Sequence, residues 1–436
     1  MILRALRWFR PAKHIGRLSG PEAQRAWPRY RWQVFEASFV GYAMFYVVRN
    51  NLGVVAKELG AALHYDKAMI GDILAGTAIA YGVGKLVMGF LSDRSDPRKF
   101  IFAGLLLTAL CNFAFGASTS FGMHLALWSL NGLIQGMGYG PCARGLSHWY
   151  AAAERGSIFG VWNMAHNIGG GAVGVIAATC AHHFGWPSAF YVPGAIATVG
   201  ACYLLWRMVD TPESVGLPPI EEHAAGAATA EPELTLHEIV VGHILTNRML
   251  WLVAVANFFV YIARYSMLDW GPTYLKEVKG ATLIGGGVST LVIEFAGALG
   301  MLTMGWLSDR WGGRRGRVSV ICLLPLIAAF AALRFTPPGL LWLDLALLGC
   351  VGFLVYVPVM MLGVMSLDLT SKKAVGTAAG FVGLFGYLGR VVQGKGLGWL
   401  AQHHGWDAAL EAIVVCAALA AALLVFTWNV RPTSGR

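Results

Sequence analysis

The chain has 436 residues, of which 56% are hydrophobic and only 13% are charged, and its mean hydropathy is +0.58. Soluble domains carry about 25% charged residues, so this composition argues against a soluble enzyme, a DNA-binding protein or a disordered regulator. A helix that spans a bilayer needs about 20 mostly apolar residues, and the length accommodates about twelve such helices with short connections.

The chain begins with a basic segment rather than an apolar run. Arg4, Arg7 and Arg10 recur every three residues with aromatic residues between the last two, which is typical of an amphipathic segment on anionic lipid. Pro11 interrupts the segment, and no cleavable signal peptide is expected. Twelve apolar runs follow, six on each side of a long connection: 32–56, 69–91, 100–119, 124–145, 157–181, 187–206, 249–272, 281–307, 317–335, 340–364, 375–400 and 405–428.

These runs predict helices rather than the strands of a membrane barrel. They are longer than barrel strands of about 10 residues, they lack strict alternation, and they are rich in the Gly and Ala that close helix packing requires. We therefore predict an all-α membrane protein with twelve transmembrane helices in two six-helix halves. The seven cysteines lie inside apolar runs without metal-ligand spacing, so we expect no metal and no cofactor.

The distribution of Lys and Arg predicts the orientation. Outside the spans, the side opposite the termini carries only Lys57, Lys67, Lys276, Lys279 and Arg334. The positive-inside rule therefore places both termini in the cytoplasm. The predicted organisation is a cytoplasmic segment 1–31, a first half 32–206, a cytoplasmic linker 207–248 rich in Pro, Ala and Glu, a second half 249–428 and a cytoplasmic tail 429–436.

An internal repeat relates the two halves. GFLSDR at 89–94 recurs 216 residues later as GWLSDR at 305–310, and Arg49 and Arg264 are 215 residues apart. Two halves related by an axis along the membrane normal are the organisation of major facilitator transporters. Each motif ends in an Asp–Arg pair that we expect to pair with neighbouring helix ends. These residues are Asp93, Arg94, Asp309 and Arg310.

Buried charge gives the first indication of function. An ionised side chain at the bilayer centre costs about 2.5–3.5 kcal/mol on insertion scales, and it persists where it faces water, a partner or a substrate. Among the acids only Glu294 lies deep in a span, whereas the spans contain the cations Arg49, Lys85, Arg144, Arg264, Arg390 and Lys395. This surplus of positive charge predicts a central cavity that receives an anion.

Helical spacing places polar residues beside these cations. The groups that share a helix face are Tyr42, Tyr46 and Arg49; Tyr81 and Lys85; Asn163, His166, Asn167 and Gly170; and Tyr261 and Arg264. A guanidinium group binds phosphate through two parallel hydrogen bonds, which favours Arg over Lys for oxyanions. Tyrosines add neutral donors, and histidine adds a donor whose charge changes near physiological pH.

Several segments resemble the signature of the organophosphate:phosphate antiporter family. They are GYAMFYVVRNN (41–51), AYGVGKLVMGFLSDRSDPR (80–98), QGMGYGPCARG (135–145), RGSIFGVWNMAHNIGGG (155–171), VYIARYSMLDWGPTYLKEVK (260–279) and KKAVGTAAGFVGLFGYLG (372–389). The similarity runs along nearly the whole chain. It is greatest to bacterial members that carry glycerol-3-phosphate, through RWQVF (31–35), GLPPIEEH (216–223) and DWGPTYLKEVK (269–279).

The resemblance implies roles for individual residues. It places the two phosphate-binding arginines at Arg49 and Arg264, the pore lysine at Lys85, and the central histidine at His166 beside Asn163. It also implies two acids with gating or salt-bridge roles, Asp269 and Glu294. The substrate-facing tyrosines would be Tyr42, Tyr46, Tyr81, Tyr261, Tyr356 and Tyr387.

The chain departs from the glycerol-3-phosphate carriers of that family at three positions. Asn50 stands where they have a lysine, and GYLGRVVQGKGLG adds Arg390 and Lys395 to an otherwise uncharged eleventh helix. Arg390 follows Tyr387 by three residues, so we expect it to reach the substrate cavity. Lys395 points about 140° away from Arg390 at about 100° per residue, so we expect it at an acid or at the outer mouth. A pore-lining Arg390 would favour a more negatively charged substrate.

Structural roles are the alternatives for the same residues. Arg49 and Arg264 could each hold a helix end, and His166 could hydrogen-bond a neighbouring helix. Lys85 could extend its ammonium to the membrane surface. Arg144 is expected in helix packing or an inner gate, and the tyrosines could simply fill the bundle core.

The resemblance implies a transporter that imports an organic phosphate, glycerol-3-phosphate first, in exchange for inorganic phosphate by alternating access. It would work as a monomer in the lipid bilayer of the bacterial inner membrane, with no nucleic-acid partner and no enzymatic activity. The alternatives are exchange of hexose phosphate or phosphoglycerate, a transporter-like sensor of hexose phosphate, and proton-coupled symport through Glu294 or Asp269.

Overall fold

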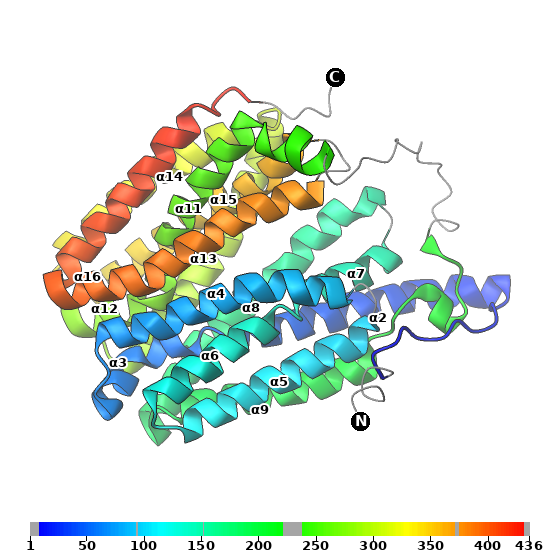
Figure 1. The fold of residues 1–436 in the computed structure, drawn as a ribbon, viewed down its shortest axis with the longest axis horizontal. Helices are drawn as coiled ribbons and strands as arrows, with labels where there is room; N and C mark the ends of the chain where they lie inside the picture. Colours follow the sequence, from blue (N-terminus) through cyan, green and yellow to red (C-terminus); the bar gives the residue numbers. More distant parts are fainter. Residues whose placement is uncertain (1–7, 93–94, 151, 221–237, 371–374, 431–436) are drawn as a thin grey trace.

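A computed structural model describes residues 8–92, 95–150, 152–220, 238–370 and 375–430, and all the regular elements in these ranges are helices (Figure 1). The helices are α2 (Gly20–Val47), α3 (Asn51–Leu63), α4 (Lys67–Ser92), α5 (Pro97–Ala117), α6 (Phe121–Gln135), α7 (Tyr139–Trp149), α8 (Ala152–Phe184), α9 (Ser188–Arg207), η1 (Pro212–Val215), η2 (Glu238–Leu245), α11 (Arg248–Asp269), α12 (Gly271–Val278), α13 (Leu283–Arg310), α14 (Arg315–Phe335), α15 (Leu341–Asp368) and α16 (Val375–Val425).

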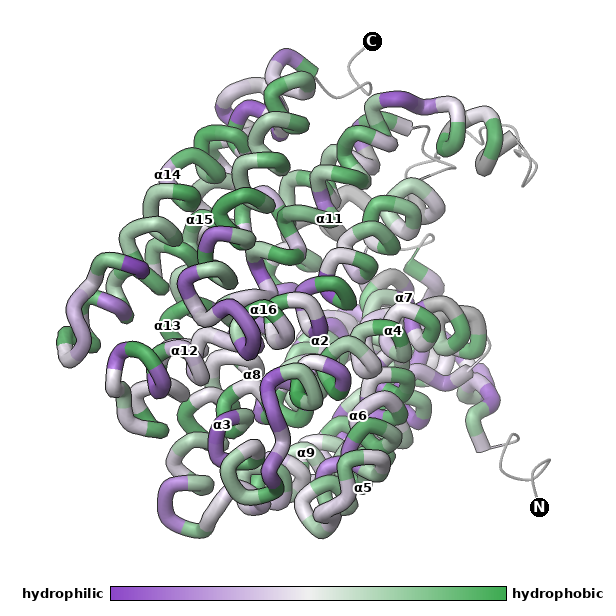
Figure 2. The backbone as a smooth tube through the Cα atoms, turned by 60° about the vertical axis from the view of Figure 1, so that its left-hand side comes forward, coloured by the Kyte–Doolittle hydropathy of each residue, from purple (hydrophilic) through white to green (hydrophobic). Residues whose placement is uncertain are grey.

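The predicted twelve-helix architecture is confirmed. The first span is formed by α2 and α3, the fourth by α6 and α7, and the last two by α16, which bends at Gly405 where φ is 82°. Within the described residues, eight helices are long and apolar enough to cross a membrane, namely α5, α8, α9, α11, α13, α14, α15 and α16. Figure 2 shows hydrophobic residues along α14 and α15 and hydrophilic residues at the turns.

The first helix begins earlier than the apolar pattern indicates. The run starts at Trp32, but α2 begins at Gly20, so part of the predicted 1–31 segment is helical. The Ser19 hydroxyl donates to Glu22 Oε2 over 2.6 Å, and the Ser19 backbone N–H donates to the same carboxylate over 3.3 Å. This capping box starts a helix whose first turns project beyond the apolar span.

The N-terminal segment contacts the connection between the halves. The backbone N–H groups of Ile15 and Leu18 donate to Glu213 O and Gly216 O over 3.1 and 2.8 Å. Ala12 N donates to Asp210 Oδ2 over 2.9 Å. Residues 12–18 therefore bind the first part of the 207–248 linker. Arg4 and Arg7 of the predicted lipid-binding segment lie outside the described residues.

The two halves pack against each other through α4 with α16 and through α8 with α13. In Figure 1 the helices from α2 to α9 occupy the lower part of the molecule and those from α11 to α16 the upper part. Glycines allow close backbone approach: a Cβ at Gly71 would lie 2.6 Å from Gly394 O, and one at Gly287 would lie 2.2 Å from Gly174 O. Small residues at such positions are typical of helix packing in lipid.

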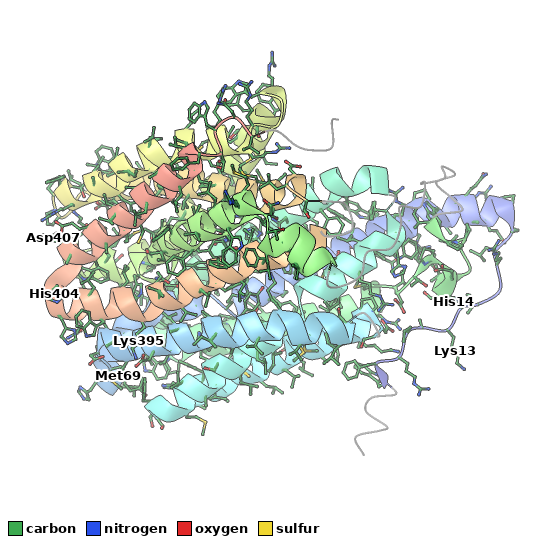
Figure 3. The ribbon with its side chains drawn as sticks, turned by 45° about the horizontal axis from the view of Figure 1, so that its top comes forward. Lys13, His14, Met69, Lys395, His404 and Asp407 are labelled. Atoms are coloured by element: carbon green, nitrogen blue, oxygen red, sulfur yellow. The ribbon has the colours of Figure 1, made fainter. Side chains whose placement is uncertain are left out.

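One end of the bundle is closed by ion pairs between the halves. We call it the sealed end; α3, α12 and the bend of α16 lie there, and Figure 3 shows Lys395 near Met69 at this end and Lys13 at the other. Three lysine–carboxylate contacts cross the interface there: Lys276 Nζ to Glu58 Oε2 at 2.6 Å, Lys67 Nζ to Glu277 Oε2 at 3.0 Å, and Lys395 Nζ to Asp72 Oδ1 at 2.8 Å. Lys395 thus pairs with an acid, one of its two predicted environments.

The opposite end, which we call the open end, contains a cavity of about 710 Å³ between the halves. The first half contributes Tyr139, Trp162 and Asn163 to its lining, and the second half contributes Met301 and Arg315 among others. Two of its lining residues, Tyr139 and Asn163, contact Lys85 and His166, so the cavity borders the predicted site residues.

Candidate functional site

Arg49 lies at a break in the first transmembrane helix. The α2 helix ends at Val47 and α3 begins at Asn51, so Arg49 belongs to neither helix. Its guanidinium carbon lies 4.3 Å from the ring centroid of Tyr46 and 4.4 Å from that of Tyr81. Arg49 is 7% exposed. The break places a buried cation between two tyrosine rings at the centre of the bundle.

Side-chain amides hold this break. The carbonyl of Val48 accepts from Asn112 Nδ2 over 3.2 Å and from Asn131 Nδ2 over 3.1 Å. The carbonyl of Phe45 accepts from Gln135 Nε2 over 3.0 Å. A broken helix in a membrane requires such donors because no water satisfies its free carbonyl groups.

Gln135 also holds Arg49 itself. Its Oε1 accepts from Arg49 Nε over 2.9 Å and from Arg49 Nη2 over 2.8 Å. The sequence analysis did not select Gln135, although it opens the QGMGYGPCARG segment. A buried polar side chain inside an apolar run was the available signal.

Arg264 provides the matching cation of the second half. It lies within α11, is 7% exposed, and faces three tyrosine rings. Its guanidinium carbon lies 4.3 Å from the centroid of Tyr356, 5.0 Å from that of Tyr265 and 6.0 Å from that of Tyr261. In the part of the chain that the structure describes, neither Arg49 nor Arg264 forms a salt bridge with a carboxylate.

Aromatic rings connect the two arginines. On one side, the ring of His166 lies 5.4 Å from Tyr46 and 6.2 Å from Tyr356. On the other side, Tyr387 lies 5.1 Å from Tyr81 and 5.8 Å from Tyr261. We refer to Arg49, Arg264 and these six aromatic residues as the arginine–tyrosine ring. The structure thus brings together eight of the residues that the sequence analysis selected.

Other predicted residues lie at the edge of this ring. The Tyr42 side chain stacks on Trp162 at 4.4 Å, and its hydroxyl lies 3.5 Å from that of Tyr46. The backbone carbonyl of Asn163 contacts His166 Nδ1, and Asn163 lines the open-end cavity. These residues connect the ring to the cavity.

Lys85 is exposed and faces the rings of Tyr139, Tyr387 and Tyr81, with its Nζ 5.3, 5.4 and 5.8 Å from their centroids. It therefore adds a third positive charge beside the arginine–tyrosine ring. Unlike the two arginines, it remains accessible.

Glu294 connects the halves next to the ring. It is 1% exposed, and Asn167 Nδ2 of the first half donates to its Oε2 over 2.8 Å and to its backbone carbonyl over 3.1 Å. The contact joins α8 to α13. Glu294 therefore belongs to the interface between the two halves.

Arg390 lies beside the site but contacts other partners than expected. Its Nη2 lies 3.7 Å from Asp269 Oδ1, and its guanidinium carbon lies 3.9 Å from the centroid of Tyr265. Tyr265 also contacts Arg264, so one ring lies between Arg390 and Arg264. Asp269 therefore pairs with an arginine, Arg390, that belongs to the same half of the protein.

The charged residues of the repeated loop motifs are only partly visible. Arg310 is exposed and lies over the ring of Trp306 at 5.3 Å. Asp93 and Arg94 lie outside the described residues, as does the side chain of Asp309. Arg144 donates to the carbonyls of Ser92 and Ser95, so it joins the end of α4 to Ser95.

The site therefore combines a buried arginine from each half, neutral aromatic donors and a flanking lysine, which is the donor chemistry that suits a small multivalent anion. Residues 38–394 match the Major Facilitator Superfamily, and the chain belongs to this family of membrane transporters. Its relatives within this family include transporters of glycerol-3-phosphate, hexose phosphate and phosphoglycerate, and also a membrane sensor protein of Escherichia coli that is 34% identical over 91% of this chain and 92% of the relative.

Two curated relatives resemble the chain over nearly its whole length. The glycerol-3-phosphate transporter of Haemophilus influenzae is 40% identical, with 92% of this chain and 91% of the relative covered. A probable hexose phosphate transport protein of Chlamydia pneumoniae is 37% identical, with 97% of each chain covered.

The fold also has a close structural counterpart. It is a bacterial homologue of the human lysosomal transporter Spinster, solved in an inward-facing, unoccupied conformation. It superimposes with a TM-score of 0.71 at 14% identity, covering 92% of this chain and 95% of the other. The match to the Major Facilitator Superfamily and the similarity to the Haemophilus relative identify the protein as a multi-pass membrane transporter and not an enzyme.

Proposed function

We propose that the protein imports glycerol-3-phosphate in exchange for inorganic phosphate by alternating access. The observation that carries this proposal is the arginine–tyrosine ring, to which each half contributes one buried arginine that forms no salt bridge within 4.0 Å among the described residues. A phosphate group offers several oxygens that two guanidinium groups can share. Its binding neutralises both cations in one step.

The orientation follows from the distribution of basic residues. We propose that the open end faces the cytoplasm of a bacterium and that both termini lie there. The sealed end then faces outward, and the structure corresponds to an inward-facing carrier. Because one central site serves both sides, a single polypeptide would suffice for transport.

Exchange rather than net transport follows from electrostatics. When the site is empty, Arg49 and Arg264 repel each other, and bringing the halves together around them is unfavourable. A bound phosphate ester or inorganic phosphate removes that repulsion and favours the closed intermediate. A ligand changes a conformational equilibrium only through such differential binding.

Hexose phosphate is the second candidate substrate. The similarity to the hexose phosphate protein, 37%, is close to the 40% found for the glycerol-3-phosphate transporter. The phosphate-binding half of the site would be the same for both substrates. The organic part of the substrate would then be selected by the residues around it.

The test is counterflow of radiolabelled phosphate in proteoliposomes against glycerol phosphate, hexose phosphate, phosphoglycerate and phosphoenolpyruvate. We expect glycerol-3-phosphate to compete most strongly. If hexose phosphate competes best, the second candidate is correct. If no phosphate moves while the protein is folded and inserted, the transport proposal is wrong and a sensor becomes the better interpretation.

A matched pair of substitutions controls for the general effect of replacing an arginine. Arg264→Lys changes the ring, whereas Arg334→Lys changes an arginine that is 38% exposed and pairs with Asp407 at 3.3 Å. We expect the first to stop exchange and the second to leave it unchanged. If both variants exchange phosphate at similar rates, Arg264 does not bind the substrate.

A further inference from the structure

The two arginines of the site are held differently. One oxygen atom of Gln135 accepts two N–H groups of Arg49, whereas Arg264 Nε is buried without a hydrogen-bond partner among the described residues. We propose that Gln135 is a positioning residue that makes Arg49 the fixed phosphate ligand of the site and leaves Arg264 as the adjustable one. The inference rests on the proposed function, since it concerns how the same site binds phosphate.

The geometry determines which edge of Arg49 remains available. A guanidinium group has five N–H donors in a rigid plane. Gln135 occupies the edge formed by Nε and Nη2, which is one of the two edges that bind an oxyanion through paired bonds. The remaining donors, one on Nη2 and two on Nη1, form the end of the group. Phosphate therefore meets Arg49 end-on.

Gln135 is itself fixed, which is what a positioning residue requires. It is 1% exposed, and its Nε2 donates to Phe45 O over 3.0 Å. That bond directs the amide oxygen toward Arg49. The same residue thus connects the orientation of the guanidinium group to the carbonyl groups at the helix break.

An amide is suited to this role because it carries no charge. It orients Arg49 while leaving the full positive charge for the substrate. A carboxylate at this position would form a buried ion pair and neutralise the cation before phosphate arrives. Gln135 therefore orients the guanidinium group of Arg49 without competing with phosphate for its positive charge.

The second half lacks a counterpart. In the fourth helix of each half the repeat offset is 220 residues, because Gly132 packs against Thr77 as Gly352 packs against Ile293. This offset places Val355 where the first half has Gln135, and Val355 is apolar and 1% exposed. Arg264 consequently keeps the edge formed by Nε and an Nη group. A phosphate held end-on by Arg49 can then be received by that edge of Arg264 when the halves approach.

The experiment measures binding of inorganic phosphate to purified full-length protein, through the rise in melting temperature with phosphate concentration. The variants are Gln135→Met, which keeps the length of the side chain but removes the amide, and Gln135→Glu, which adds a charge. The control is Asn257→Leu, which removes a buried amide that donates to Val382 O over 2.9 Å in the second half and contacts neither Arg49 nor the helix break among the described residues.

We expect Gln135→Met to raise the Kd for phosphate about tenfold, as loss of a hydrogen bond to a charged group does. Gln135→Glu should abolish detectable binding. Asn257→Leu should lower the melting temperature without phosphate while changing the Kd less than threefold. In exchange assays Gln135→Met should raise KM more than it lowers the maximal rate.

The outcomes separate this inference from the proposed function. If Gln135→Met or Gln135→Glu binds phosphate as the wild type does, the positioning role of Gln135 is wrong. Exchange by the wild type would then still support the proposed function. If the wild type binds phosphate with the expected variant pattern but exchanges nothing, the inference stands and the transport proposal fails. If the wild type does not bind phosphate, both are overturned.

Discussion

The ion pair between Lys276 and Glu58 predicts an asymmetric response to substitution at the sealed end. The Lys276 side chain is 2% exposed, whereas that of Glu58 is 27% exposed, and the ammonium also donates to Val54 O over 2.8 Å. Burial lowers the pKa of Lys276, and the carboxylate of Glu58 offsets that effect only in part. The lysine therefore carries most of the desolvation cost of the pair.

Removing Glu58 leaves a buried ammonium group with a single carbonyl partner. Loss of one partner of a buried pair costs about 3–5 kcal/mol; the retained bond to Val54 O and the partial exposure of Glu58 reduce this to about 2–3 kcal/mol. We expect Glu58→Ala to shift the equilibrium away from the sealed conformation by about 30- to 150-fold. Lys276→Met removes the charge together with its desolvation cost, so we expect less than about 1 kcal/mol.

Spin labels at positions 62 and 404, on α3 and on α16 at its bend, would report the populations as interlabel distances. The labels require a background without the seven native cysteines. We expect a longer-distance population to grow in Glu58→Ala and to remain small in Lys276→Met. An equal response of the two variants, or a larger one for Lys276→Met, would refute this account of the pair.

Three further predictions concern the site. Arg49→Lys and Arg264→Lys should each lower phosphate exchange at least tenfold in proteoliposomes, because an ammonium cannot form paired bonds to phosphate. Near-normal exchange in both variants would contradict a site built on the two arginines. His166→Gln should slow exchange and flatten its dependence on pH, since the amide does not titrate; an unchanged pH profile at full rate would make His166 a packing residue. Arg390→Gly should lower exchange because it leaves the buried Asp269 without its cation, and combining it with Asp269→Asn should restore exchange. The order in which the double variant prefers its substrates then reports whether Arg390 selects among phosphate esters. Failure of the second substitution to restore exchange would contradict the role of the pair.

Much of the fold and site could be predicted from local sequence. Apolar runs and the repeated GxLSDR motif determined the six-plus-six arrangement, because membrane helices must satisfy their backbone internally and so leave long patterns. The buried cations Arg49 and Arg264 were found because charge inside a span is costly. The match of long motifs to one family extended this to the tyrosines, which composition alone does not distinguish from core residues.

The remainder depended on contacts between distant residues. The break at residues 48–50 contains neither proline nor glycine, and the amides that hold it come from α5 and α6. Gln135 and Arg49 are 86 residues apart in sequence. Arg390 was placed with Tyr387 by helical spacing, yet its ion-pair partner, Asp269, comes from the end of α11. Spacing along one helix determines a face but not which neighbour that face meets.

The polarity of the first span has a consequence for how the protein is made. α2 carries Glu36 within the span, supplies Tyr46 to the arginine–tyrosine ring and is followed by Arg49 at the break. It is not among the helices that meet the criteria of length and hydropathy for a membrane span, whereas α5, α8 and α9 of the same half do. We expect the translocon to release this first segment into lipid only after a more apolar neighbour has been synthesised, so that early truncations should remain incompletely integrated. The residues that we propose to recognise phosphate would thus delay the carrier's own membrane insertion.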